Sequence, residues 1–319
     1  MRHKFRRAAH IWRTQGFRVL AEKITGYLPI EINNILYRMR QKSPSRIMDE
    51  DWDTLVILDA ARFDMFQSQN TITGELEHRI SLGSTSEEFL DRNFSGRTYH
   101  DTVYVNTNPY IPYLNLDDGT FHAVIDLLEE WDEDLQTILP GTVTEAALQA
   151  HEEFPQKRLI IHFMQPHAPF IGEIGQELDM GGWNPDQESA GLGGNTIWQF
   201  LRKHPPESSE KIDLDLVWKA YNENLDLVLQ HVEQLLKELN GKTVITADHG
   251  NLVGERLSPI PTKRFYGHPY GVYHPNLVKV PWLKIESDKR RDIIAEPPRS
   301  TESIDQDVTQ ERLEALGYK

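Results

Sequence analysis

The sequence has 319 residues, is 39% hydrophobic and carries a formal net charge of −15. A chain of this length can bury a large core, so we expect one α/β domain with appendages. The net negative charge argues against nucleic acid as a substrate. The chain has no cysteine, which fits either side of a membrane. No stretch reaches the roughly 18 apolar residues that a membrane span needs, so we expect a cytoplasmic or membrane-peripheral protein.

The first 46 residues are basic. They hold eleven Lys or Arg and two Glu, a net charge of 11 − 2 = +9, which leaves 34 − 11 = 23 basic and 49 − 2 = 47 acidic residues, or −24, elsewhere. Phe5, Trp12 and Phe17 are among the apolar side chains that lie between the arginines. The pattern fits an amphipathic helix that makes peripheral contact with an anionic membrane, and it fits equally well a helix docked on the acidic body.

An apolar, β-branched run, Thr54–Leu58, ends in Asp59. Such a run is typical of a buried parallel strand, and open α/β sheets place ligand-binding residues just beyond the carboxyl ends of their strands. Asp59 therefore lies where a metal ligand is expected, although an isolated Asp after a strand more often caps the next segment.

A glycine and three hydroxyl residues, Ser84, Thr85 and Ser86, follow the short strand-like run near residues 78–82. Thr85 with Glu88 three residues on is a capping-box pattern, which predicts a helix start. Helix starts also bind anions through their backbone N–H groups, so a cap residue and a phosphate-attacking hydroxyl can coincide.

A further buried strand is predicted at residues 159–163 and leads to His167, which is held between Pro166 and Pro169. The prolines stop the strand and restrict the loop, so His167 is a better candidate for a binding residue than His162 within the apolar run. We expect His162 to be a hydrogen-bonded core or sub-surface histidine rather than a ligand.

The run Thr243–Ala247 ends in Asp248 and His249, an adjacent carboxylate and imidazole that suit a divalent cation. Adjacent residues of an extended strand point to opposite faces, so both reach one ion only if the chain bends, and Gly250 makes that bend easy. Taken alone, the pair is equally consistent with turn chemistry. Further on, His268 lies in a turn-rich loop that precedes another strand.

Strand-like runs near residues 54–58, 78–82, 101–105, 159–163, 243–247 and 280–285 alternate with helical stretches. This alternation predicts an α/β fold with a doubly wound, mostly parallel sheet and helices on both faces. We expect the catalytic domain to span residues 49–286, with an insertion near 172–209. A basic amphipathic segment at 1–48 would precede it, and a tail at 287–319 with a short helix would follow it.

The ordered set of motifs resembles the alkaline phosphatase and sulfatase superfamily, in particular its sulfatase-like hydrolases and transferases, over residues 52–285. Residues 162–170 are similar to a segment that carries a substrate histidine, 243–250 to the metal strand, and 267–270 to a segment with a further substrate histidine. Residues 83–89 are similar to the nucleophile turn of the lipoteichoic acid synthase type, which also uses a threonine.

The resemblance implies an alkaline phosphatase-like fold and a metal site. Asp59, Asp248 and His249 would bind one divalent metal ion, which could be Mn, Mg, Zn or Ca. Thr85 would be both the nucleophile and the fourth ligand. The rival nucleophiles are Ser84 and Ser86.

The substrate contacts also follow in part from the resemblance. His167 and His268 would contact the oxyanion of the substrate, and either could supply the proton for the leaving group. Arg62 and Arg264 are additional candidates for binding phosphate, although an arginine on a loop is usually just solvated.

Two departures from the family narrow the activity. The usual sulfatases carry a Cys, or sometimes a Ser, in a Cys-x-Pro-x-Arg-like signature that is oxidised to formylglycine, and this chain has neither a Cys nor that signature. Sulfate-ester hydrolysis by that route is therefore not expected. The family also carries paired aspartates after its first strand, whereas Ala60 follows Asp59 here. One metal thus fits better than a calcium sulfatase site or a two-zinc phosphatase site.

We therefore expect a metal-dependent phosphoester, or sulfoester, hydrolase or phosphotransferase that acts through a covalent intermediate on Thr85. Its substrate would be a small-molecule, glycan or lipid phosphoester. One alternative is a sulfatase-like sulfo-ester hydrolase that lacks formylglycine. The other is a degenerate, non-catalytic module that binds an anion or a glycan, which the loss of a second aspartate at Ala60 favours.

Overall fold

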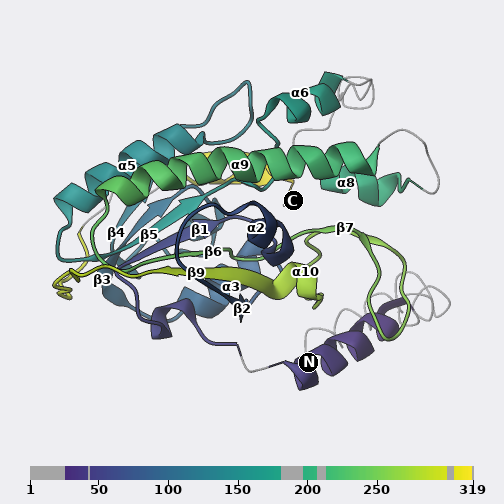
Figure 1. The fold of residues 1–319 in the computed structure, drawn as a ribbon, viewed down its shortest axis with the longest axis horizontal. Coiled ribbons are helices and arrows are strands. Elements are labelled where there is room, and N and C mark those ends of the chain that lie inside the picture. The colour runs from purple at the N-terminus through teal and green to yellow at the C-terminus, as the bar shows by residue number, and fades with distance from the viewer. Residues whose placement is uncertain (1–25, 42–43, 181–196, 207–212, 300–304, 318–319) are drawn as a thin grey trace.

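A seven-stranded sheet forms the centre of the computed structural model, in the order β2-β9-β6-β1-β5-β3-β4 (Figure 1). The structure describes residues 26–41, 44–180, 197–206, 213–299 and 305–317. The strands of the sheet are β1 (Thr54–Leu58), β2 (Glu75–Ile80), β3 (Tyr99–Asn106), β4 (Phe121–Asp126), β5 (Arg158–Phe163), β6 (Thr243–Thr246) and β9 (Lys279–Ile285). Outside it, β7 (Leu252–Glu255) and β8 (Phe265–Gly267) form an antiparallel pair.

The pairing confirms the predicted doubly wound, mostly parallel sheet. β1 lies parallel to β5 and β6, and β3 lies parallel to β4 and β5, whereas β9 runs antiparallel to both of its neighbours. All five residues of β1 are buried, because helices cover both faces of the sheet. β4 was not predicted from the sequence, since a short apolar run flanked by polar residues gives a weak strand signal.

Helices connect the strands. They are α2 (Phe63–Gln69), α3 (Ser86–Phe94), α4 (Tyr110–Tyr113), α5 (Pro140–Glu153), α6 (Glu173–Met180), α8 (Ile197–Lys203), α9 (Leu214–Glu238), α10 (Pro275–Val278) and α11 (Gln306–Ala315), with a 3-10 helix at Ile47–Asp49 and a helix over residues 26–40. α9 spans 25 residues, and its N-cap Asp213 accepts a hydrogen bond from the N–H of Asp215 at 2.9 Å. Its buried residues recur at helical spacing, so one face of α9 packs on the sheet.

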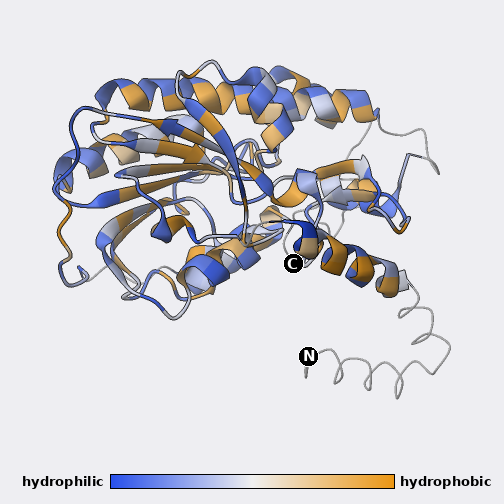
Figure 2. Cartoon of the chain, turned by 60° about the horizontal axis from the view of Figure 1, so that its bottom comes forward, coloured by the Kyte–Doolittle hydropathy of each residue, from blue (hydrophilic) through white to orange (hydrophobic). Residues whose placement is uncertain are grey.

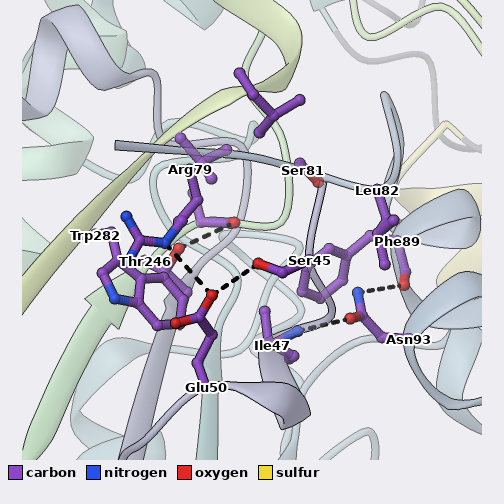
Figure 3. A pocket seen from close by; sticks show the side chains of 13 residues that line it. Ser45, Ile47, Glu50, Arg79, Ser81, Leu82, Phe89, Asn93, Thr246 and Trp282 are labelled. Carbon is purple, nitrogen blue, oxygen red and sulfur yellow. Dashed lines mark hydrogen bonds and ion pairs between the residues drawn. The ribbon is translucent and has the colours of Figure 1, made fainter. Parts of the chain in front are cut away.

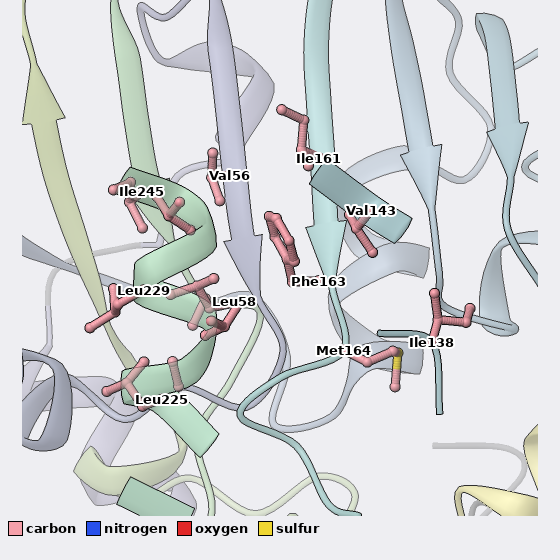
Figure 4. Close-up of a cluster of buried hydrophobic side chains, with 14 of the residues drawn as sticks. Val56, Leu58, Ile138, Val143, Ile161, Phe163, Met164, Leu225, Leu229 and Ile245 are labelled. Atoms are coloured by element: carbon pink, nitrogen blue, oxygen red, sulfur yellow. The ribbon is translucent and has the colours of Figure 1, made fainter. Parts of the chain in front are cut away.

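Alternate residues of the central strands enter two hydrophobic clusters, one on each face of the sheet. Val56 and Leu58 of β1, with Phe163 of β5, pack on the face that α5 and α9 cover (Figures 1 and 4). Leu55 and Ile57 of β1 belong to the second cluster, together with residues of α3, α4 and α11. Because β1 is buried on both sides, the residues just after it have a rigid support.

The appendages differ in part from the expected organisation. The predicted insertion contains α6 and α8, and Trp198 of α8 is buried in the main hydrophobic cluster beside Phe170 and Tyr221. Part of that segment is therefore a core element, anchored by the buried Trp198, Phe200 and Leu201, which the surrounding polar sequence concealed. The tail contains a short helix, α11, whose Leu313 is buried in the second cluster.

The predicted basic segment is only partly visible. Residues 1–25 lie outside the described residues, whereas residues 26–40 form a helix at the edge of the molecule (Figure 1). Asn33 and Asn34 of this helix are buried against the loops before and after β8. Within the described ranges, none of the helices is both long and apolar enough to cross a membrane.

A buried aspartate joins the starts of β1 and β6. Asp53 Oδ2 accepts hydrogen bonds from the backbone N–H of Lys242 at 2.7 Å and from Arg290 Nε at 2.6 Å. Gly241 lies beside this contact with a φ of +89°, and a Cβ on it would lie 2.6 Å from Asp53 Oδ2. Both the backbone conformation and the crowding therefore require glycine here.

We predict that Gly241→Ala lowers the free energy of unfolding by about 2–4 kcal/mol, because overpacking adds to the cost of a left-handed alanine. The matched control is Gly96→Ala: Gly96 has a φ of +71°, but among the described residues no atom lies within 4 Å of its ideal Cβ. The control should cost about 1 kcal/mol. Urea denaturation measures both losses, and equal losses would contradict the role of the Asp53 contact.

Candidate active site

The carboxyl ends of four neighbouring strands, β6, β1, β5 and β3, meet at one edge of the sheet. The polar residues that follow these ends are Asp248 and His249 after β6, Asp59 after β1, His167 after β5 and Asn108 after β3. Strands that pair in parallel end at the same edge, so residues far apart in the sequence converge there.

Asp59, Asp248 and His249 form a compact group, the metal cluster, in which one ligand atom of each residue lies within 4.8 Å of the others. His249 Nε2 lies 3.4 Å from Asp248 Oδ2 and 3.8 Å from Asp59 Oδ1. All three side chains are fully buried, and Asp59 Oδ1 and Asp248 Oδ2 have no hydrogen-bond partner among the described residues. Buried carboxylate oxygens of this kind beside an imidazole fit a divalent cation.

Ala60 holds the metal cluster through its backbone. It follows Asp59 with a φ of +64°, a left-handed conformation that alanine rarely adopts. Its N–H donates to Asp248 Oδ1 at 2.9 Å, and its carbonyl accepts a hydrogen bond from the Tyr221 hydroxyl. The N–H of His249 donates to the same Asp248 oxygen at 2.8 Å. Two backbone donors thus fix one oxygen of Asp248 and orient the carboxylate.

The three hydroxyls before and at the start of α3 face different partners. Thr85 is the N-cap, and its Oγ1 accepts from the backbone N–H of Glu88 at 3.2 Å, as the capping-box pattern predicts. Ser84 Oγ lies 2.7 Å from Glu88 Oε2. Ser86 Oγ lies 3.2 Å from Asp59 Oδ2 and 3.2 Å from the imidazole Nε2 of the metal cluster. Ser86 is therefore the hydroxyl that contacts the cluster, whereas Thr85 caps the helix.

Three histidine rings lie together at the site. The ring centroid of His268 is 4.6 Å from that of His249 and 5.0 Å from that of His167. Nδ1 of His249 and Nδ1 of His167 each lie against the carbonyl oxygen of the next residue, and Nδ1 of His268 lies 2.8 Å from Asn251 Oδ1. An oxygen acceptor requires Nδ1 to carry the proton, so each neutral ring has its lone pair on Nε2.

Burial and neighbouring charges shift the pKa values of the titratable groups in the site. Burial, together with the positive charge of neighbouring histidines and of Arg202, lowers the pKa of His268 well below its ordinary value. Burial is also the main cause that lowers the pKa of His167. Burial opposes the ionisation of Asp59, but the surrounding histidines outweigh it and lower its pKa. At pH 7 the site therefore combines an ionised carboxylate with neutral imidazoles at positions 167 and 268.

The two arginines that the sequence suggested as phosphate contacts lie in different settings. Arg62 is 5% exposed and pairs with Asp64 at 2.6 Å and with Glu255 at 2.7 Å. Its donors already bind carboxylates, so a phosphate contact would require these pairs to break. Arg264 is exposed just before β8 and donates to the carbonyl oxygen of Gly254 at 2.8 Å. The phosphate contacts of both arginines stay predictions.

A chain of amides supports the metal cluster and was missed in the sequence. Asn108 Nδ2 donates to Asp59 Oδ2 at 3.0 Å, and the N–H of Asn108 donates to Asn106 Oδ1 at 2.9 Å. Asn106 Nδ2 in turn donates to Asp126 Oδ2 at 2.7 Å. The only signal in the sequence was a pair of asparagines after a predicted strand, which is also ordinary turn chemistry.

Two further groups near the site also emerge from the structure. His162 is hydrogen-bonded to the Tyr104 hydroxyl at 2.8 Å, which confirms the expected core histidine, yet its Nε2 lies 3.6 Å from Asp59 Oδ2. Arg202 of α8 is close enough for its charge to lower the pKa of His268. Arg202 was not a candidate from the sequence, because its segment was expected to be a loop insertion.

Glu88 joins the hydroxyl-bearing turn to the loop that carries His268. Its Oε2 accepts from the N–H of Ser84 at 3.0 Å and from the N–H of Gly271 at 3.2 Å, and its Oε1 pairs with Arg92. Glu88 is 2% exposed, so these contacts are shielded from water. The residue that the sequence assigned to a helix cap thus connects two segments of the site.

A small pocket lies beside the end of β6, where Thr246 and Ala247 line it (Figure 3). Its volume is about 20 Å³, room for about one water molecule, and its lining includes Ser81 and Thr246. Arg79 pairs with Glu50 at 3.6 Å on one side of it. The Ser81 hydroxyl donates to the backbone carbonyl of Asp248, so the wall of the pocket supports the cluster. The pocket is too small to hold a substrate.

No protein-family model matches the sequence, and no curated protein matches it. Among solved structures, the soluble domain of lipooligosaccharide phosphoethanolamine transferase A from Neisseria meningitidis is 12% identical with a TM-score of 0.46, over 74% of this chain and 76% of that one. The C-terminal periplasmic domain of EptC from Escherichia coli, in complex with Zn, is 12% identical with a TM-score of 0.45, over 76% of this chain and 75% of that one. A protein in the alkaline phosphatase superfamily from Vibrio parahaemolyticus is 9% identical with a TM-score of 0.40, over 83% of this chain and 69% of that one.

The seven-stranded, mostly parallel sheet with helices on both faces agrees with the α/β fold that the sequence predicts. The activities and the zinc in these names belong to those proteins. One expectation from the sequence is contradicted: we expected a cytoplasmic protein, but the matched domain of EptC is described as periplasmic. Composition and the lack of an apolar span carry no information on which side of a membrane a domain works, which is why the expectation failed.

We predict that Glu88→Gln loosens the loop that carries His268, because the amide keeps the size of Glu88 but loses the charge that binds two backbone donors and Arg92. Amide hydrogen exchange at Gly271 should become about 10- to 100-fold faster, the range expected for a lost charge-assisted hydrogen bond. The control is Asp91→Asn, an exposed carboxylate on the same helix. Unchanged exchange at Gly271 in the Glu88 variant would contradict the link.

We predict a pH-dependent effect of Asp126→Asn. Burial raises the pKa of Asp126 from 3.8 to about 6, so its contribution to stability is fully present below pH 3.8 and is lost as the pH rises through about 6. Between pH 4 and pH 7 the free energy of unfolding of the variant should therefore gain up to about 3 kcal/mol relative to the parent. Urea denaturation at several pH values measures the difference, with the exposed Asp118→Asn as control. A pH-independent difference for Asp126→Asn would refute it.

Proposed function

We propose that this protein is a metal-dependent phosphoester hydrolase or phosphotransferase whose nucleophile is Ser86. The observation that carries the proposal is the position of Ser86 Oγ, which is buried and lies 3.2 Å from both Asp59 Oδ2 and His249 Nε2. A hydroxyl in this place has an acceptor for its proton and lies at a site that fits a cation. Both conditions favour attack on an anionic phosphate.

Asp59, Asp248 and His249 would hold one divalent cation, whose charge lowers the pKa of a nearby hydroxyl and attracts phosphate oxygens. The tautomer of His249 suits this role, because Nδ1 is bonded to the next carbonyl and Nε2 presents its lone pair. Asn108 and the backbone N–H of Ala60 would hold the two carboxylates in place.

The chain's own groups account for the bonds that change. Ser86 Oγ would give its proton to Asp59 Oδ2 and form a bond to phosphorus while the P–O bond to the leaving alcohol breaks. The leaving oxygen would take a proton from His167 or His268. His167 and His268 are neutral before substrate binds, but a phosphate anion beside them raises their affinity for a proton, so that they become donors. Water or an acceptor alcohol would then attack the phosphoserine and release Ser86.

The proposal places the nucleophile one residue after Thr85, which the family resemblance implies. Attack by Thr85 would remove the acceptor of the Glu88 N–H and open the helix cap. Ser86, in contrast, is the first residue of α3, where backbone N–H groups at a helix start can bind the oxygens of the phosphate. The substrate would be a phosphoester of a small molecule, a glycan or a lipid.

The test compares the hydrolysis of p-nitrophenyl phosphate, bis-p-nitrophenyl phosphate and p-nitrophenyl sulfate with Mn, Mg, Zn or Ca. We expect metal-dependent turnover of a phosphate probe that falls by roughly 1,000-fold or more in Ser86→Ala and in Asp248→Asn. The matched variant is Thr85→Asn, because asparagine is as good an N-cap as threonine but has no hydroxyl. It should keep turnover within about tenfold of the parent.

Peptide mass spectrometry after a brief incubation with substrate locates the phosphorylated residue. Phosphate on Ser86 supports the proposal. Phosphate on Thr85, with activity lost in Thr85→Asn, would return the nucleophile to the residue that the resemblance implies. Dominant turnover of the sulfate probe would instead indicate a sulfo-ester hydrolase. A protein that binds no divalent ion and turns over no probe would be a binding module.

A further inference from the structure

An apolar stripe on the helix over residues 26–40 faces solvent. Leu28, Ile32, Ile35 and Met39 are 54%, 37%, 54% and 77% exposed. Their spacing of four, three and four positions places them on one face of the helix. Figure 2 shows this helix at the edge of the molecule with apolar residues along its length. Single exposed apolar residues are common, but a stripe of four large ones marks an interaction surface.

The opposite face of the helix is fixed to the body. Asn33 Nδ2 donates to the carbonyl of Ile260 at 2.7 Å, and the N–H of Ile260 donates to Asn33 Oδ1 at 2.9 Å. Asn34 Nδ2 donates to the carbonyl of Gly271 at 2.8 Å, and the N–H of Tyr273 donates to Asn34 Oδ1 at 2.8 Å. Two buried amides that each donate and accept set the rotation of the helix. The stripe is therefore held outward.

The charge distribution of the chain indicates which kind of partner can cover the apolar stripe. Residues 1–46 carry +9 and the rest of the chain carries −24, as counted above. Arg38 and Arg40 are exposed on the same helix. A second copy of this chain would bring one +9 segment against another, which like-charge repulsion opposes. An anionic lipid surface would attract this segment and repel the acidic body, so that only this end of the protein could approach.

A cavity beside the helix adds to this surface. It has a volume of about 300 Å³ and its lining includes Tyr37, Arg38, Arg92 and Tyr273. Arg38 lies over the ring of Tyr273, with 4.3 Å between the guanidinium carbon and the ring centroid. A guanidinium beside aromatic rings at the border of an apolar stripe suits the headgroup of an anionic lipid.

We propose that the helix over residues 26–40 docks the protein on an anionic lipid surface. The stripe would enter the boundary between headgroups and acyl chains, and Arg38 and Arg40 would contact the headgroups. Because Asn34 binds the loop that carries His268, the surface would lie beside the candidate active site. The inference does not rest on the proposed function, since it concerns the surface to which the protein binds and needs no turnover.

The test is co-sedimentation of the full chain with vesicles of phosphatidylglycerol and phosphatidylcholine, and with phosphatidylcholine alone, at low and high salt. We expect binding to the anionic vesicles that weakens with salt, and a loss of about tenfold or more in the double variant Ile32→Glu, Ile35→Glu. The matched control is Ile294→Glu, because Ile294 is 43% exposed on another part of the molecule. Its binding should equal that of the parent.

A melting temperature equal to that of the parent shows that each variant is folded. If the double variant unfolds, Met39→Glu replaces it, since Met39 is 77% exposed and its change leaves the buried face intact. The proposal is overturned if the parent fails to bind anionic vesicles, or if binding persists unchanged in the stripe variants. It is also overturned if sedimentation velocity shows a dimer that the stripe variants dissociate, because a second copy would then cover the stripe.

Discussion

The site depends on the burial of two carboxylates side by side. Asp59 and Asp248 are both fully buried, and like charges in such a place repel each other and lose their hydration. The folded chain compensates with hydrogen bonds from Asn108, from the Ala60 backbone and from the His249 backbone, and with the histidines around Asp59. A divalent cation would neutralise the remaining negative charge of the two carboxylates. Their burial therefore lowers the stability of the fold and at the same time prepares the site for a metal.

The fold makes this burial feasible because it delivers the ligands from its most rigid part. β6 and β1 are adjacent interior strands, and their parallel register brings Asp59 beside Asp248 and His249. His268, in contrast, comes from a loop after the separate pair β7 and β8, and Asn251 and Glu88 hold that loop against the sheet edge. The positions of the candidate metal ligands are thus determined by backbone pairing, whereas the position of His268 is determined by side-chain contacts.

The sequence could predict the residues that strand ends place. Asp59 and the Asp248-His249 pair follow apolar runs directly, so the sheet alone decides where they lie. It could not decide between Thr85 and Ser86, because successive residues at a helix start differ by about 100° in direction and both are hydroxyls. Only the packing of α3 against β1 shows which of them meets Asp59.

Long-range side-chain contacts were also out of reach of the sequence. Glu88 fitted a local capping pattern, yet its carboxylate binds a backbone group in the loop after β8. Asn108 lies in the loop after β3, 49 residues from Asp59, and no local signal marks their contact. The buried Trp198 similarly turned part of an expected surface loop into a core helix. In each case tertiary packing, rather than local pattern, determined the role.

The loop that carries His268 and the end of β8 before it are in contact with three other segments of the chain. Asn34 bonds to it on either side of Val272, Glu88 bonds to the N–H of Gly271, and a Cβ at Gly267 would lie 2.9 Å from Trp198 Cβ. A change in one anchor alters the fit of the others, because all act on one short segment. These positions, on the helix over residues 26–40, on α3 and on α8, should therefore co-vary among homologues.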